Sequence, residues 1–111
     1  MAKEIVADYT SGDTLHFFVR NVSGYIWQTT TSAFVEYEEA NKANYDTAMP
    51  EIFKSGSSGG SCYMGDFPTG ITAGGRYFIQ VFDSGDVERF YGWIWWTGTE
   101  EDFIPRRLRI R

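Results

Sequence analysis

The sequence of 111 residues has few of the residues that bind metals or form cross-links. It contains one cysteine, Cys62, and one histidine, His16. A single cysteine excludes an intramolecular disulfide, and without a second histidine or a cysteine pair there is no recognisable zinc site. We expect Cys62 to be a small buried apolar residue and His16 to be a solvated surface side chain. The sequence therefore predicts no metal and no cofactor.

Long apolar runs and a signal peptide are also missing. No run approaches the roughly 18 residues that a membrane-spanning helix needs. The first residues lack a basic region followed by an apolar one, so no signal peptide is predicted as the sequence is written. We therefore expect neither insertion into a membrane nor a membrane partner.

The positive charge is concentrated at one end. The net charge is −5, and residues 105–111 contain four arginines, so removing their charge leaves −9 on the remaining residues. An acidic body repels phosphates and argues against broad contact with nucleic acid.

Patterns that carry enzyme chemistry are scarce. The adjacent acidic residues at 38–39 and 100–101 fall in expected loops, and any serine–histidine–aspartate set would depend on His16. The glycine-rich stretches lack the lysine of a phosphate loop. The acidic run at 83–88, DSGDVE, lacks the ligand spacing of a calcium loop and is explained by a hairpin turn. We therefore predict that the protein is not an enzyme.

Aromatic residues and alternation with a period of two are abundant, since aromatics make up 18% of the chain. Alternating apolar and polar residues between turn-forming clusters are typical of half-buried strands. Pro50 marks an edge or a bulge in one of them, and helical composition occurs only at 35–44, where at most a turn or two is expected. Strands are expected at residues 3–9, 13–20, 24–28, 32–37, 45–53, 61–68, 76–82 and 87–96.

This spacing predicts an all-β fold with one domain. We expect a single antiparallel β-sandwich of about seven to eight strands over residues 1–98. Residues 99–111 are expected to form an extended basic C-terminal tail, and the Gly/Ser stretch at 55–60 is read as a mobile hairpin tip.

Three of the four tryptophans lie in residues 91–98, YGWIWWTG. In a strand, neighbouring side chains point to opposite faces. The alternation divides the segment into two sets, and the spacing Gly92-x-Ile94-x-Trp96, which resembles that of the small β-modules described below, implies that this set faces the core. The opposite set points outward and consists of Tyr91, Trp93 and Trp95, with Phe78 and Phe82 beside it if residues 76–82 pair with this strand.

These outward aromatic residues are predicted to bind another protein, because exposed aromatics are enriched at interfaces. The alternative is that the chain's own C-terminal tail or a loop covers them. A register shift of one residue would exchange the core and the outward sets.

The tail has its own alternation, because Leu108 and Ile110 alternate with arginines after Pro105. It is either a frayed end, one more edge strand, or an arm that adds to a neighbouring subunit or docks on its acidic surface. Nucleic-acid binding by these arginines is opposed by the acidic body. The tail residues predicted to contact a partner are Arg106, Arg107, Arg109 and Arg111.

Residues 67–82, FPTGITAGGRYFIQVF, resemble a strand of immunoglobulin-like and prealbumin-like modules, in which a loop with glycine leads into Tyr-x-hydrophobic-x-hydrophobic. The resemblance implies that Tyr77 is the tyrosine of a tyrosine corner. It also implies that Trp27 takes the place of the core tryptophan, although the cysteine pair of antibody domains is missing.

A second resemblance covers residues 5–98. The chain is similar to small β-modules of phage and prophage structural proteins in Tyr63-x-Gly65-x-Phe67-Pro68, Gly75-x-Tyr77 and Gly92-x-Ile94-x-Trp96-x-Gly98. This resemblance implies a virion component, such as a head decoration protein or a tail accessory domain, located in the virion. Its expected partners are copies of itself or other virion proteins, and no catalytic residue comes with it.

A carbohydrate-binding β-sandwich is the alternative function. In that case Tyr91, Trp93 and Trp95 would form a platform that stacks on the sugar rings of surface glycans, and Gln80 would add polar contacts.

Overall fold

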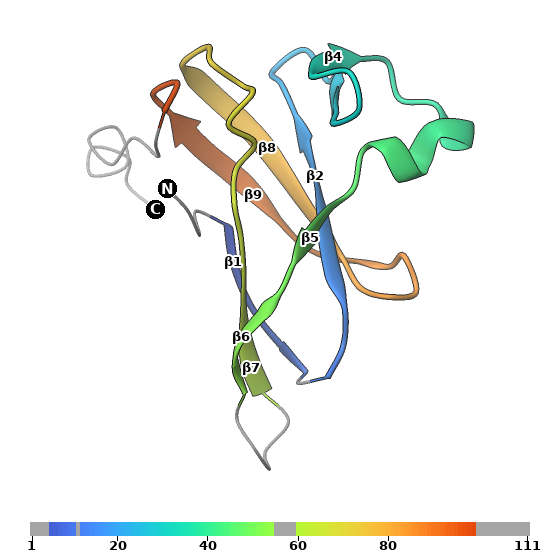
Figure 1. Cartoon of the computed structure of the whole chain (residues 1–111), viewed down its shortest axis with the longest axis vertical. Helices are drawn as coiled ribbons and strands as arrows, with labels where there is room; N and C mark the ends of the chain where they lie inside the picture. Colours follow the sequence, from blue (N-terminus) through green and yellow to red (C-terminus); the bar gives the residue numbers. More distant parts are fainter. Residues whose placement is uncertain (1–4, 11, 55–59, 100–111) are drawn as a thin grey trace.

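The computed structural model describes residues 5–10, 12–54 and 60–99, and the regular structure within them consists mostly of antiparallel strands (Figure 1). The all-β prediction is confirmed. Within the described residues there is one short 3-10 helix, η1 (Glu39–Asn44), where no more than a turn or two was expected. The strands are β1 (Ile5–Thr10), β2 (Leu15–Arg20), β3 (Ile26–Gln28), β4 (Ala33–Val35), β5 (Thr47–Met49), β6 (Glu51–Lys54), β7 (Gly60–Gly65), β8 (Gly75–Phe82) and β9 (Glu88–Trp96).

The strands form two sheets. One sheet has the order β1-β7-β6, and the other has the order β4-β3-β2-β8-β9, with β5 also paired to β2. In the second sheet, β8 and β9 form a hairpin in which Tyr77 pairs with Ile94 and Phe78 pairs with Trp93. This hairpin supplies one edge of the sheet, since β9 is its last strand.

Pro50 divides a segment that was predicted to be a single strand. Residues 47–49 pair with β2 in one sheet, whereas residues 51–54 pair with β7 in the other. Proline has no N–H to donate to a ladder, so it suits the point where the chain leaves one sheet for the other. Its carbonyl still accepts a hydrogen bond from the Met64 N–H at 3.1 Å. The described chain therefore has nine strands rather than the expected seven to eight.

The main core lies between the two sheets. Alternate residues of the central strands point into it, as the period of two predicts. The residues involved are Leu15, Phe17 and Val19 from β2, Tyr77, Ile79 and Val81 from β8, Ile94 and Trp96 from β9, and Ile5, Ala7 and Tyr63 from the opposite sheet. The Trp96 indole donates a hydrogen bond to the Ile71 carbonyl at 2.7 Å, so its polar atom is satisfied inside the core.

A second, smaller core covers part of the other face of β2. Phe18, Ile26 and Tyr45 are buried there, with Tyr37 and Phe82 packed around them. The segment that contains η1 lies over this face and brings Tyr45 against Phe18, with ring centroids 6.1 Å apart. Phe18 therefore has a buried environment on the face of β2 that the alternation assigned to polar residues.

Two single-residue predictions were wrong. Cys62 is half-buried rather than buried, because its strand neighbour Tyr63 points into the core and the alternation turns Cys62 the other way. His16 is not solvated, because its ring stacks on Phe82 with centroids 5.6 Å apart and its side chain is 15% exposed.

Candidate interaction surface

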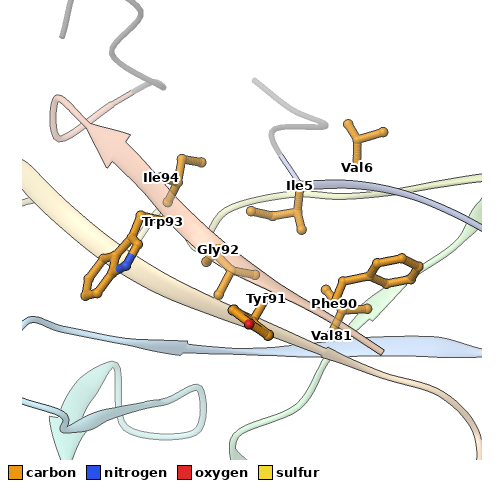
Figure 2. A pocket seen from close by; sticks show the side chains of 9 residues that line it. Ile5, Val6, Val81, Phe90, Tyr91, Gly92, Trp93 and Ile94 are labelled. Atoms are coloured by element: carbon orange, nitrogen blue, oxygen red, sulfur yellow. The ribbon is translucent and has the colours of Figure 1, made fainter. Parts of the chain in front are cut away.

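The outward set of β9 residues lies where the alternation placed it. Ile94 and Trp96 are buried, whereas Tyr91 is 73% exposed and Trp93 is 47% exposed. The Tyr91 and Trp93 side chains leave the β9 ribbon on the opposite side from Ile94 (Figure 2). The predicted register of β9 is therefore confirmed.

Phe78 of β8 joins these two residues into one surface. Its ring centroid lies 5.1 Å from that of Trp93 and 5.8 Å from that of Tyr91. The rings are tilted against Phe78 by 58° for Trp93 and 39° for Tyr91. We call Phe78, Tyr91 and Trp93 the aromatic stripe. It is a continuous but uneven apolar surface on two neighbouring strands.

Arg76 extends the stripe at the start of β8. Its guanidinium carbon lies 4.3 Å from the centroid of Trp93 and 6.0 Å from that of Trp95. A cation at this distance from an aromatic face is attracted by the electrons of the ring. Trp95 lies on the same side of the sheet. It is half-buried, so it forms the less exposed end of this surface.

Phe82 belongs elsewhere. It shares the outer face of β8 with Phe78, but it pairs across the hairpin with Glu88 and not with an aromatic residue of β9. Its ring packs against Phe18, with centroids 4.7 Å apart, and against His16. The structure therefore places Phe82 in the second core, away from the aromatic stripe.

An apolar groove runs beside the stripe, between the edge strands β1 and β9 (Figure 2). It has a volume of about 180 Å³. Gly92 forms part of its wall, and a Cβ atom at this position would meet no other atom within 4 Å. The missing side chain at Gly92 is visible in the sequence, but a linear pattern does not show that strands of different sheets, β1 and β9, lie on either side of it. The apolar side chains that line it include Ile5, Val6, Val81, Phe90 and Ile94.

The acidic run at 83–88 forms the predicted hairpin turn. The Asp83 N–H donates to the Val87 carbonyl at 3.0 Å. The Asp83 carboxylate accepts hydrogen bonds from the N–H groups of Gly85 and Val87, at 2.8 and 3.1 Å, and from Arg89 Nε at 2.8 Å. The Arg89 bond, followed by the backbone bonds, lowers the pKa of Asp83 from 3.8 to about 2. All of these partners come from the protein, so Asp83 organises the turn.

The tip of this hairpin is joined to η1. Asp86 lies 3.1 Å from Lys42 Nζ and 3.3 Å from His16 Nε2. Asp46 lies 3.6 Å from the same nitrogen, and burial raises the pKa of Asp46. The arrangement ties the turn to the segment that covers the second core. Within residues 5–10, 12–54 and 60–99, no group of three or more His, Cys, Asp or Glu side chains is arranged to hold a metal ion.

The predicted partner-binding arginines, Arg106, Arg107, Arg109 and Arg111, lie outside the described residues, as do most of the proposed tail and the tip at 55–59. No helix in the described part has the length and apolar character that crossing a bilayer requires. Comparison of the chain with models of protein families, with curated proteins and with solved structures finds no match.

Proposed function

We propose that this chain is a non-enzymatic assembly module that binds a second copy of itself through the aromatic stripe. The observation that carries the proposal is the exposure of Tyr91 and Trp93, 73% and 47%, on a face where Phe78 joins them. Large aromatic side chains lose unfavourable contact with water when a partner covers them, and they dominate the energy of many interfaces. A regular strand pair also presents them on a rigid backbone.

A second copy suits this surface in charge as well as in shape. Arg76 lies at one end of the stripe, and the sequence adds four more arginines at 106–111. The remaining residues carry a net charge of −9, so a neighbouring copy offers an acidic surface to a basic and aromatic one.

The ring geometry favours a protein partner over a sugar. Stacking on a sugar ring uses an open aromatic face, whereas Tyr91 and Trp93 each pack at an angle against Phe78, at 39° and 58°. Arg76 also lies over one face of Trp93. Carbohydrate binding is therefore the second candidate. Binding to a glycan array that disappears in Trp93→Ala but not in Tyr25→Ala would favour it.

We further propose that the fold is an immunoglobulin-like sandwich and that the assembly is a phage particle, with this chain as a decoration or tail accessory module in the virion. Two features support the first part. The Tyr77 hydroxyl donates to the Ala73 carbonyl at 2.7 Å, as a tyrosine corner does, and Trp27 is buried in the main core. The second part rests on the resemblance of the sequence motifs to phage structural proteins.

Light scattering at several protein concentrations tests the self-association. We expect the native mass to rise above that of the monomer, and we expect Tyr91→Ser with Trp93→Ser to remain monomeric. Tyr25→Ser is the matched control, since Tyr25 is 44% exposed and lies in the β2–β3 turn, outside the stripe. A native protein that stays monomeric at all concentrations would overturn the proposal, and so would loss of association in the control.

A further inference from the structure

The outer face of the β8–β9 hairpin carries opposite charges at its two ends. Residues that pair across a hairpin share one face of the sheet. The pairs on the outer face, in order along β8, are Arg76 with Trp95, Phe78 with Trp93, Gln80 with Tyr91, and Phe82 with Glu88. The aromatic stripe therefore lies between an arginine at one end of the face and a carboxylate at the other.

Glu88 reaches this face because of a β-bulge. The residues of β9 in the aromatic stripe have odd numbers, so strict alternation would turn Glu88 to the inner side. However, Phe82 pairs with Glu88, whereas the residue before Phe82 pairs with Phe90. Arg89 is the extra residue, and its side chain bonds to Asp83. An extra residue of this kind reverses the alternation beyond it, so the hairpin has an acidic end next to its turn.

Both end charges are available to a partner. Arg76 and Glu88 are exposed, and in the part of the chain that the structure describes neither of them belongs to an ion pair. Other charges nearby are engaged within the chain. Asp86 lies 3.1 Å from Lys42 Nζ, and Arg20, on the same face as the stripe, donates from its Nε to a side-chain amide of β8.

We propose that the second copy packs its own aromatic stripe on this one about a two-fold axis, with the strands antiparallel, so that Arg76 of each copy meets Glu88 of the other. The inference rests on the proposed function and names the surface of the second copy that is bound. Two-fold contacts between identical surfaces are the commonest in homo-oligomers.

The spacing of the charges along β8 fits such an axis. Arg76 lies three residues before Ile79, and Phe82, the cross-strand partner of Glu88, lies three residues after it. A two-fold axis over Ile79, perpendicular to the strands and parallel to the sheet, therefore exchanges the basic and the acidic ends. Stacked sheets lie about 10 Å apart, a distance that an arginine and a glutamate side chain can bridge together.

The charges also select this packing over the other face-to-face arrangement. An axis parallel to the strands would place the two basic ends together and the two acidic ends together. Like charges brought together across an interface are costly, whereas opposite charges fix its register. In the antiparallel packing, the middle of each stripe covers the middle of the other, so Tyr91 and Trp93 leave water in both copies.

Charge reversal tests the inference, with the self-association measured by sedimentation. We expect Arg76→Glu alone and Glu88→Arg alone each to weaken the association roughly tenfold or more, because each homodimer then has two like-charge contacts. An equal mixture of the two variants should associate about as tightly as the native protein, since every contact again joins an acid and an arginine. Native mass spectrometry should show mostly mixed dimers, which also reports that both variants are folded.

Asp8→Arg is the matched control, because Asp8 is exposed on β1 of the other sheet. It makes the same charge change as Glu88→Arg and should leave the association unchanged. Native protein that associates while the mixture is no tighter than either variant alone would overturn this inference and leave the self-association standing. Native protein that stays monomeric would overturn the proposed function, and this inference with it.

Discussion

At the scale of single residues, Asp83 shows how a polar side chain is accommodated at the edge of the core. It is buried, and its two carboxylate oxygens accept hydrogen bonds from the turn that it begins, from Arg89 and from the Tyr9 hydroxyl. A charged group taken out of water is tolerated when its acceptor sites are filled in this way. The hairpin that presents the aromatic stripe is therefore held at its turn by one ionised side chain.

The lowered pKa of Asp83 leads to a pH-dependent contribution to stability. The pKa is 3.8 in an unfolded reference and about 2 in the folded chain. A lowered pKa means that the stabilisation is fully present above about pH 4 and is lost as the pH falls towards 2. We expect Asp83→Asn to be less stable than the native protein at pH 7 and to lose less stability between pH 4 and pH 2.

Urea unfolding of the two proteins at pH 7, 4 and 2 measures this difference. If the free energy of unfolding falls equally in the native protein and in Asp83→Asn between pH 4 and pH 2, the pKa of Asp83 is not lowered and the account of this turn is wrong. Glu88→Gln is a suitable control, because Glu88 is an exposed carboxylate next to the same turn.

Gly65 is required by close packing. A Cβ atom at this position would lie 2.7 Å from Phe17 Cε1 and 2.8 Å from Met49 Cγ, inside the main core. We expect Gly65→Ala to lower the free energy of unfolding by about 1–3 kcal/mol, because two buried side chains must move. Gly85→Ala, where the nearest atom is 3.5 Å away, should change it by less than about 0.5 kcal/mol in chemical denaturation. Equal stability of both variants would contradict this account of Gly65.

At the scale of elements, β2 is buried on both faces by different partners. Phe17 points to the opposite sheet and Phe18 to the segment around η1. We expect Phe17→Ala and Phe18→Ala each to lower the free energy of unfolding by about 3–5 kcal/mol, as truncation of a buried phenylalanine does.

Hydrogen exchange should separate the two variants. Phe18→Ala should speed exchange first at Asn41 and Tyr45, whose amides are bonded within the η1 segment. In Phe17→Ala, the η1 segment should exchange no faster than the rest of the fold, because Phe17 contacts the other sheet and not this segment. The same pattern of exchange in both variants would mean that the second core is not an independent unit.

The sequence predicted most of the strands, but it did not predict which strands pair with one another. Alternation identified β2, β8 and β9 and divided the residues of β9 between two faces, because a period of two is a local property. It did not reveal that Pro50 sends β5 and β6 to different sheets, or that the η1 segment covers Phe18. Both depend on contacts between residues far apart in the chain, which a linear pattern does not encode.

The candidate surface shows the same division. Tyr91 and Trp93 were predicted to be exposed, and Phe78 was predicted to lie beside them. Phe82 was predicted to join them as well, since it has the same phase as Phe78. The Phe82 ring instead packs in the second core, because His16 and Phe18 of the neighbouring strand β2 lie against it.

At the scale of the whole molecule, the described part of the two sheets carries an aromatic stripe on one outer face and an apolar groove along one side. The aromatic stripe occupies the face of the β8–β9 hairpin, and the groove occupies the gap between β9 and β1. Among the described residues nothing covers most of Tyr91 or about half of Trp93, and large aromatic side chains left in water are unfavourable. In the proposed assembly a second copy would bury the stripe and remove that cost, and this is the central claim of the account.

Salt should weaken this association. In the proposed association, complementary charges would bring a basic and aromatic surface to an acidic one, and added ions screen such attractions. We expect the dissociation constant of the self-association, measured by sedimentation, to increase several-fold between low and high salt, because only the apolar part of the contact is insensitive to screening. Association that strengthens steadily with salt would indicate an interface governed by apolar contacts alone.

Hydroxyl-radical footprinting, read residue by residue by mass spectrometry, tests the central claim most directly. The protein would be oxidised when dilute and when concentrated, with Tyr25 as an exposed internal reference outside the stripe. The account predicts that oxidation of Tyr91 and Trp93 falls several-fold as the concentration rises, while oxidation of Tyr25 stays constant. Equal oxidation of all three side chains at every concentration would contradict it.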